Sequence, residues 1–260
     1  YKTPIDNLVV GISGNSPYGL ATQFSSTGDF RYIAYSSELK EIAYTINGAY
    51  EIVPGLSVSA GFTYADIDLK QQAKFNSTYI TSTVIGPGLV LPDANAEWDA
   101  AGRGYGWNAA LLWEVTDRLS VGAMYRSELA AKVEGELNVD GLSAPIMTAI
   151  FGGSTFRTSI DTDVTLPDSV TVGASYELDE KTTLALELGW TGWSDYEQFN
   201  FVYGTSNAVL ALNNPVLRRF DDTISVNAGV SHKVSDSLTI MGGYAFFEGA
   251  ATNDNYDNVP

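Results

Sequence analysis

A hairpin pattern that recurs along the chain is the feature that most constrains its fold. Each copy consists of an alternating strand, a short turn that is acidic in most copies, and a second alternating strand. Three clear copies and a looser fourth lie at Ala109–Tyr125, Val172–Leu186, Ala228–Ile240 and Asn47–Ala60, with turns near Asp117, Glu180, Asp236 and Pro54. Long polar connections rich in Gly, Ser and Asn join the copies. Tight turns at one end of the strands and long loops at the other are typical of an outer-membrane β-barrel.

The strands of these hairpins are apolar on one face only. In one of them Leu184, Leu186, Leu188 and Trp190 alternate with Ala185, Glu187, Gly189 and Thr191. Successive side chains of a strand point to opposite faces of the sheet. The sequence therefore predicts a meander of antiparallel strands with a convex, lipid-facing side that carries Trp113, Val121, Leu184, Leu186, Leu188 and Val226.

A soluble β-sandwich also alternates, so strand length distinguishes the two folds. The strands here run to about ten residues or more, whereas strands of globular sheets usually have about five or six. A tilted strand needs ~9–11 residues to cross the hydrocarbon layer. No segment approaches the ~18 consecutive apolar residues of a transmembrane helix, which excludes a helical membrane protein. Tyr and Trp gather near the strand ends, as expected for rings at the two membrane boundaries.

Composition excludes several classes of function. The formal net charge is −17, from 31 acidic and 14 basic residues. This charge argues against nucleic acid as a partner, because the phosphates would be repelled. The acidic residues lie mostly in turns and loops, where they form a solvated rim. The chain contains no cysteine, which excludes a disulfide framework and thiolate chemistry.

The alternation predicts about nine strands, although bacterial single-chain barrels have an even number. The expected strands cover residues 8–24, 39–51, 56–70, 104–115, 118–133, 164–178, 182–199, 219–234 and 238–248. The chain begins at Tyr1 with neither an initiator Met nor a charged and apolar leader, and it ends at Pro260 inside an expected loop. We therefore expect residues 1–260 to form one partial barrel domain with two free edges.

Five segments, in the same order along the chain, resemble signatures of the FadL-type outer-membrane transporters of long-chain fatty acids and other hydrophobic compounds. They are Pro17–Phe24, Gly104–Trp113, Met124–Glu128, Leu166–Val170 and Trp190–Tyr196. The resemblance implies an all-β, fourteen-stranded, transmembrane antiparallel barrel in the bacterial outer membrane, plugged by an N-terminal hatch. The hatch with its Asn-Pro-Ala motif, the first two strands and about three C-terminal strands are then expected to be absent from this chain.

The resemblance further implies passive, lateral diffusion of a fatty acid or hydrocarbon through an opening where the third barrel strand kinks. Membrane lipid and lipopolysaccharide would be the other partners of a monomeric barrel that needs no cofactor. Carried over to this sequence, the kink falls at Pro17, Tyr18, Gly19 and Leu20. The local chemistry agrees, because Pro cannot donate to a strand ladder and Gly weakens one. The alternative is that residues 13–16 are an ordinary strand end.

Substrate contacts are expected on the lumen-facing side, with Leu112, Met124, Arg126 and Trp193 as candidates. Arg126 could bond a carboxylate head group bidentately, or it could brace the wall by pairing with Glu128 or Glu187. Two loops are more apolar than exposed loops usually are. They either pack together as a lid or form an external groove that captures a greasy substrate, and the two are compatible with each other. They contain Ile80, Val84, Ile85, Leu89, Val90 and Leu91, and residues 144–151.

A catalytic function fits the sequence less well, and we predict that the protein is not an enzyme. The single histidine, His232, lies near the turn at Asp236, whereas a hydrolase working at the external rim would need it at the opposite end of its strand. No metal-ligand spacing of the His, Cys or EF-hand type is present. The alternatives to hydrophobe uptake are a general porin and a surface barrel without transport. A porin needs opposed charges across a wet constriction, but the expected lumen positions are mostly Ala, Gly, Ser, Thr and Met.

Overall fold

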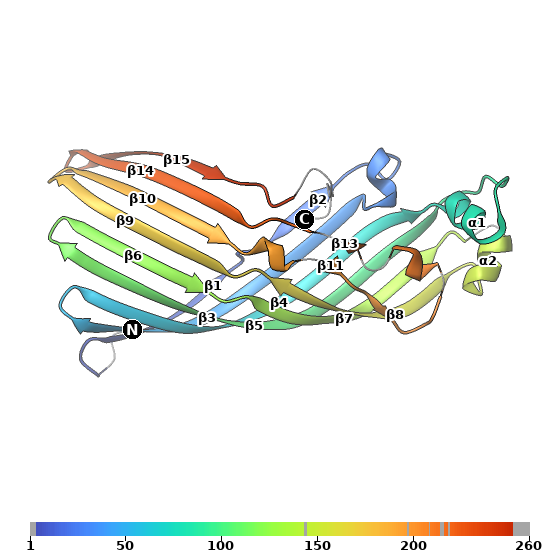
Figure 1. Cartoon of the computed structure of the whole chain (residues 1–260), viewed down its shortest axis with the longest axis horizontal. Coiled ribbons are helices and arrows are strands. Elements are labelled where there is room, and N and C mark those ends of the chain that lie inside the picture. Colours follow the sequence, from blue (N-terminus) through green and yellow to red (C-terminus); the bar gives the residue numbers. More distant parts are fainter. Residues whose placement is uncertain are drawn as a thin grey trace.

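The structure is a computed structural model that describes residues 4–142, 145–196, 198–207, 209–213, 216–217 and 219–251. Most of its strands belong to one 13-stranded sheet, which forms a long curved wall (Figure 1). The main path of the sheet runs through β1 (Leu8–Asn15), β3 (Ser36–Val53), β4 (Leu56–Phe75), β5 (Ala94–Thr116), β6 (Leu119–Arg126), β9 (Ser169–Asp179), β10 (Thr182–Thr191), β14 (Thr223–Ser235) and β15 (Leu238–Phe247).

The remaining elements extend or cover this wall. β2 (Leu20–Gln23) pairs with β3, β7 (Leu129–Asp140) pairs with β5 and β8 (Phe156–Leu166), and β12 (Val202–Tyr203) pairs with β8. A separate pair joins β11 (Gln198–Phe199) to β13 (Val216–Leu217). The helices are η1 (Asp29–Tyr32), α1 (Ser77–Ile85), α2 (Pro145–Phe151), η2 (Trp193–Asp195) and η3 (Leu210–Asn213). No helix in the described part of the chain is long and apolar enough to cross a membrane.

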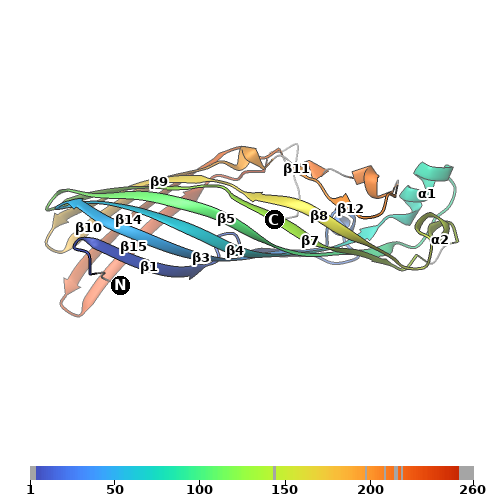
Figure 2. The ribbon, with the colours of Figure 1, turned by 90° about the horizontal axis from the view of Figure 1, so that it is seen from below.

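The predicted meander is confirmed. Tight turns lie at residues 54–55, 117–118, 180–181 and 236–237, all at one end of the wall, while α1 and α2 lie at the other end (Figure 1). The wall curves so that β14 and β15 lie behind β1 and β3 when it is seen from below (Figure 2). Within the described residues β1 and β15 end the main path without pairing with each other, so the sheet is open.

The predicted strands differ in their bounds from those of the structure, and three of them are divided. The strand expected at 8–24 is divided into β1 and β2. The strand expected at 118–133 divides at Ser127–Glu128 into β6 and β7, and the one expected at 164–178 divides at Pro167–Asp168 into β8 and β9. Pro167 has no N–H to donate to the ladder, which accounts for the second break. The strand expected at 182–199 ends at Thr191, where η2 follows.

The turn-side half of the wall is apolar on its outer face, as predicted. Leu184, Leu186 and Leu188 are 40%, 50% and 51% exposed. Leu188 lies opposite Val226, and Trp113 lies opposite Val121, so the members of each pair share this face. None of these side chains belongs to the buried core cluster. They are therefore not packed between two sheets, as a β-sandwich would require.

A row of tyrosines marks the end of this apolar band. Tyr44, Tyr64 and Tyr105 are cross-strand neighbours, with ring centroids 6.4 Å and 5.7 Å apart. Two residues further along, the outer face becomes charged, and Asp66 pairs with Arg103 at 3.8 Å. Aromatic rings are typical of the boundary between lipid and water, so we place the outer limit of the membrane at this row.

Beyond the tyrosine row the two faces exchange their chemistry. The inner face now carries the buried core, since the outer face stands in water and offers apolar groups no favourable place. This core includes Ala65, Ile67, Ala96, Ala100, Val133, Leu137, Ile160 and Val164. The change of partner along β5 builds it, because β5 pairs with β6 in its turn-side part and with β7 in its loop-side part.

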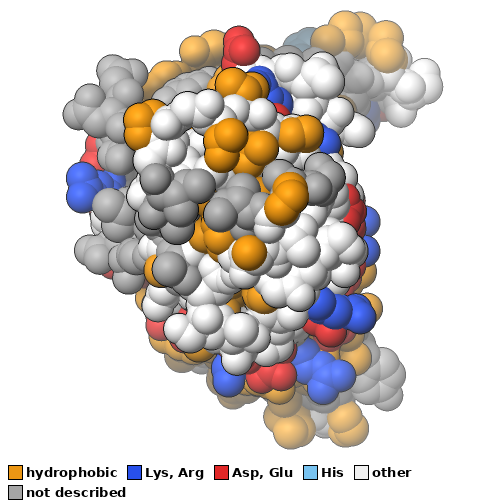
Figure 3. Space-filling model, turned by 90° about the vertical axis from the view of Figure 1, so that its right-hand side faces the viewer, with side chains coloured by type: hydrophobic (Ala, Val, Ile, Leu, Met, Phe, Trp, Pro, Cys, Tyr) orange, Lys and Arg blue, Asp and Glu red, His pale blue; other side chains and the backbone are white. Residues whose placement is uncertain are grey.

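The two apolar loops contain α1 and α2, which the sequence did not indicate. Asn76 caps α1 by accepting the backbone N–H of Tyr79 at 2.9 Å. Ile80 of α1 and Met147 and Phe151 of α2 are buried in the core cluster. These residues therefore pack together, which was one of the two predicted alternatives for the loops. Leu89 and Val90 stay exposed, whereas Ala144 and the side chains of Val84 and Ile85 lie outside the described residues. Seen from this end, hydrophobic side chains lie among polar ones, with charged groups around the edge (Figure 3).

Candidate functional site

The pairing of β1 and β2 with β3 is interrupted at residues 16–19. Asn15 lies opposite Ala43 and Leu20 opposite Leu39, so residues 16–19 face the shorter stretch 40–42. An extra residue of this kind is a β-bulge. Because side chains alternate with period two, the extra residue also exchanges the faces to which the odd-numbered and even-numbered side chains point. Ile12 shares the lipid face with Ile46, whereas Leu20 shares the inner face with Leu39.

Tyr18 reaches from this bend across the interior. Its backbone N–H donates to Oε2 of Glu41 at 3.1 Å, which ties the bend to β3. Its hydroxyl donates to the backbone carbonyl oxygen of Pro167 at 3.0 Å. The Tyr18 ring also stands edge to face against Trp193, with centroids 6.3 Å apart. Tyr18 therefore ties the bend to β3 through its backbone and to Pro167 through its side chain.

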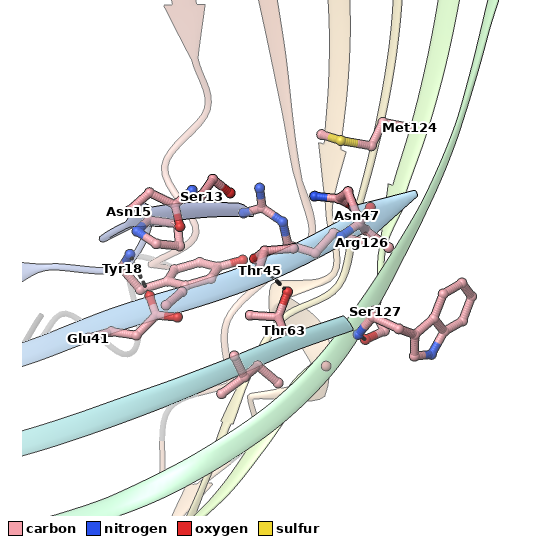
Figure 4. A pocket seen from close by; sticks show the side chains of 16 residues that line it. Ser13, Asn15, Tyr18, Glu41, Thr45, Asn47, Thr63, Met124, Arg126 and Ser127 are labelled. Carbon is pink, nitrogen blue, oxygen red and sulfur yellow. Dashed lines mark hydrogen bonds between the residues drawn. The ribbon is translucent and has the colours of Figure 1, made fainter. Parts of the chain in front are cut away.

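An interior pocket of about 130 Å³ opens beside the bend (Figure 4). Its floor is the inner face of β3 and β4, where the Thr45 and Thr63 hydroxyls lie 2.9 Å apart. Ser13, Asn15, Asn47, Asn108 and Ser127 supply further polar groups, and Ala43, Met124 and Leu129 supply apolar ones. The pocket is thus mixed in character and has room for a small head group.

Two ionisable side chains of opposite charge enter this pocket. Glu41 is 1% exposed, and its Oε1 atom has no hydrogen-bond partner among the described residues. Arg126 comes from the end of β6, and its guanidinium points toward Tyr18 (Figure 4). No ion pair joins Arg126 to Glu128 or Glu187 in the part of the chain that the structure describes. Glu187 instead accepts from the side-chain amide of Asn227 at 2.9 Å.

The structure brings some of the predicted site residues together and separates others. Pro17, Tyr18, Met124 and Arg126 line the interior pocket. Gly19 and Leu20 form the far side of the bend, and Trp193 contacts Tyr18 from η2. Leu112 lies instead in a wide turn-side chamber, which is lined mostly by small residues such as Gly122, Ala174, Ala185 and Gly229.

Glu41 is the site residue that sequence reasoning missed. One signal could have found it, because Leu39, Glu41, Ala43, Thr45 and Asn47 share one face of an alternating strand. A carboxylate among small and apolar groups on a lumen-facing row is unusual. Its contact with Tyr18, however, depends on the strand register, which the sequence alone does not fix.

A second cavity, of about 330 Å³, lies at the helix end of the wall. Residues of the strands, the helices and the loops line it, including Tyr32, Ile33, Phe75, Tyr79, Ile80, Trp98, Phe201, Tyr203 and Leu210. Phe75 and Trp98 meet edge to face, with centroids 6.0 Å apart. The cavity is mostly apolar, and Lys74 is the charged residue among those that line it.

The possible metal ligands among the described residues do not cluster. No group of three or more His, Cys, Asp or Glu side chains there could hold a metal ion. His232 lies near the tight turns, where its Nδ1 atom is 3.0 Å from the hydroxyl oxygen of Thr182. That position agrees with the sequence prediction that His232 lies near the turn at Asp236.

Comparison with known proteins then identifies the family. A family model described as outer membrane protein transport protein (OMPP1/FadL/TodX) matches residues 3–260. The chain belongs to this family. Members of the family are outer-membrane transport proteins, which agrees with the predicted barrel and location. The absence of catalytic activity in this particular protein stays a prediction.

Relatives within the family are distant in sequence. A putative outer membrane protein of Neisseria meningitidis is 24% identical over 96% of this chain and 58% of its own length. The long-chain fatty acid transport protein of Escherichia coli is 24% identical over 95% of this chain and 59% of its own length. The chain therefore spans less than two thirds of the length of these relatives.

Two solved structures share the fold. The crystal structure of a Pseudomonas aeruginosa FadL homologue has a TM-score of 0.87 at 17% identity, over 98% of this chain and 60% of that one. The Ralstonia pickettii toluene transporter TbuX has a TM-score of 0.74 at 15% identity, over 94% of this chain and 67% of that one. At these identities the likeness shows the fold alone.

Proposed function

We propose that this protein takes up long-chain fatty acids or other hydrophobic small molecules across the outer membrane by passive, lateral diffusion through the barrel wall. One observation carries the proposal. The interior pocket lies directly beside residues 16–19, where the ladder between β3 and its neighbour is interrupted. A molecule in that pocket is therefore next to the one stretch of this strand pair without regular pairing.

The chemistry around the bend favours exit into lipid. The bend begins just beyond the tyrosine row, and Ile12 and Ile46 share the outer face on its membrane side, where they are 79% and 54% exposed. An opening at the bend would therefore lead to the apolar outer face at the edge of the hydrocarbon layer. An alkyl chain loses about 0.8 kcal/mol per methylene when it leaves an apolar surface for water. A side exit avoids this cost, whereas an axial route through the turn-side chamber would not.

The helix-end cavity supplies the first step of the proposed route. Large apolar cavities near a surface usually mark binding, and this one is lined by residues of α1, β4 and β12. Substrate would be captured there, pass the core side of Tyr18 and reach the interior pocket. Membrane lipid and lipopolysaccharide surround the barrel in this proposal, and the barrel acts as a monomer.

Uptake of hydrophobes can be separated experimentally from the behaviour of a general porin. The protein, expressed from its native reading frame, is compared with an empty control for uptake of labelled palmitate and labelled toluene and for permeability to small sugars. Uptake of either hydrophobe without added sugar permeability supports the proposal. Sugar permeability without hydrophobe uptake would favour the porin, and neither activity would favour a surface barrel without transport.

A further inference from the structure

We propose that the interior pocket selects hydrophobic substrates whose head group donates a hydrogen bond, such as long-chain alcohols or alkylphenols, over those that end in a carboxylate. The proposal rests on the transport function proposed above and narrows its substrate class. The observation behind it is that Glu41 lies in the pocket with one carboxylate oxygen that accepts no hydrogen bond from the described residues.

Glu41 is held with one oxygen satisfied and the other free. Oε2 accepts the backbone N–H of Tyr18 at 3.1 Å, which fixes the carboxyl group at the bend. Oε1 is buried without a partner among the described residues, in a side chain that is 1% exposed and lines the pocket. A buried acceptor without a donor is costly and uncommon. A ligand that donates a hydrogen bond to Oε1 would remove this cost.

Arg126 completes a pair of complementary groups in the same pocket. Its guanidinium has donors only, and it is not paired with Glu128 or Glu187 in the described part of the chain. A hydroxyl group both donates and accepts, so it can satisfy Oε1 of Glu41 and accept from Arg126. An alkane can do neither.

A carboxylate head group fits the pocket less well. It has no proton to donate to Oε1, and it brings a second negative charge beside Glu41. Two carboxylates in one poorly hydrated site repel each other strongly, and a pocket of about 130 Å³ leaves little room for water between them. The attraction of Arg126 is shared with Glu41 and does not offset this repulsion in full.

The side chains of Ser13, Asn15, Asn47 and Asn108 also line the pocket and can bond a head group, but they are neutral. The hydroxyls of Thr45 and Thr63 bond to each other. Ala43, Met124 and Leu129 present apolar surface to the rest of a bound molecule. Glu41 and Arg126 are the charged residues among those that line the pocket, and they distinguish a neutral head group from an anionic one.

The test measures equilibrium binding of labelled 1-dodecanol, dodecanoate and dodecane to the full protein in detergent, at an alkaline pH at which both dodecanoate and the buried carboxyl group of Glu41 are ionised. We expect the wild-type protein to bind dodecanol at least about tenfold more tightly than dodecanoate, which corresponds to one charge-assisted hydrogen bond. Glu41→Gln removes the negative charge and adds an amide donor, so the ratio should fall to about one or reverse. Glu38→Gln is the matched control, since Glu38 lies on the same strand but pairs with Lys40 at 2.7 Å, and it should keep the wild-type ratio.

The possible outcomes separate this inference from the proposed function. Equal wild-type affinity for the alcohol and the anion, or an unchanged ratio in Glu41→Gln, would overturn the head-group selection and leave the transport proposal standing. Failure to bind any of the three probes would count against both. The wild-type ratio decides the selection even if Glu41→Gln does not insert into membranes.

Discussion

The hydroxyl of Tyr18 donates a 3.0 Å hydrogen bond to the carbonyl oxygen of Pro167, which lies between β8 and β9, so one side chain spans the interior from the bend to a distant part of the wall. Trp193 supports the ring along the way. The bend is therefore a braced feature of the wall and not a frayed strand end. The contribution of the Tyr18 hydroxyl to the free energy of unfolding can be measured.

Tyr18→Phe removes the hydroxyl and leaves the ring against Trp193. We expect the free energy of unfolding to fall by about 1 kcal/mol, the usual net value of one hydrogen bond between neutral groups. Urea unfolding in lipid vesicles measures the change. No loss at all would show that the bond to Pro167 does not hold the bend.

Leu186→Arg places a cation on the lipid face near the middle of the membrane band. The expected cost is ~2–4 kcal/mol, because Leu186 is 50% exposed on the outer face. Ala185→Arg is the matched control at the same depth, since Ala185 is the strand neighbour of Leu186 and points to the opposite face of the sheet, and it should cost less. Equal destabilisation of the two variants would contradict the assignment of the two faces.

Met147→Ala tests the packing of the helices at the loop end. Met147 is 1% exposed in the core cluster, and its sulfur accepts the Thr81 hydroxyl at 3.7 Å. Loss of the side chain should cost about 2–5 kcal/mol and should make α2 more sensitive to protease. Val90→Ala is the control, because Val90 is 91% exposed and its truncation should leave stability and protease resistance unchanged.

The turn between β9 and β10, beyond the membrane band, is expected to be sensitive to acid. The carboxylate of Asp179 accepts the backbone N–H of Lys181 at 2.8 Å and the hydroxyl of Thr182 at 3.2 Å. The bond from Lys181 is the largest of the causes that hold the pKa of Asp179 below its usual range. A group with a lowered folded pKa stabilises the folded state above its unfolded pKa, and this contribution is lost as the pH falls through the folded pKa.

Asp179→Ala should therefore lower the urea midpoint at neutral pH. The difference from wild type should shrink once the pH falls below about 4, where the unfolded carboxyl is protonated. Parallel unfolding curves at neutral and acidic pH make the comparison. A difference that is the same at both would show that ionised Asp179 is not what stabilises the turn.

The alternation of residues made the membrane half of this fold predictable. Leu186 and Ala185 belong to opposite faces in any strand of period two, and Gly and acidic residues marked the turns. The bend was also readable, because Pro17 and Gly19 are poor ladder residues. The exchange of faces beyond the tyrosine row was visible in principle, since Asp66 continues the outward series of Phe62 and Tyr64.

Other features depended on pairing between distant segments. Nothing near Glu41 in the sequence indicates that it binds the backbone of Tyr18, because that contact follows from the register of β1 and β2 on β3. The helices α1 and α2 are too short to show a clear helical period, and their apolar residues are explained by their packing on each other and on the wall, where Phe151 contacts Phe75 and Phe156. The break at Ser127 likewise follows from β5 changing its partner from β6 to β7.

The central claim is that substrate leaves sideways at the bend, and uptake by two arginine variants tests it most directly. In Gly19→Arg the new side chain starts beside the Ser16 hydroxyl, 2.9 Å from the position of its Cβ, and fills the bend. Gly122→Arg puts the same side chain into the turn-side chamber, where its Cβ meets only ordinary contacts. Both variants are expressed from the native reading frame and compared at equal surface expression for uptake of labelled palmitate or toluene.

The lateral route predicts that Gly19→Arg lowers uptake at least about tenfold, a loss that needs only about 1.4 kcal/mol of added barrier, while Gly122→Arg keeps most of the wild-type rate. The reverse result, normal uptake in Gly19→Arg and loss of uptake in Gly122→Arg, would assign transport to the axis of the barrel and contradict the account.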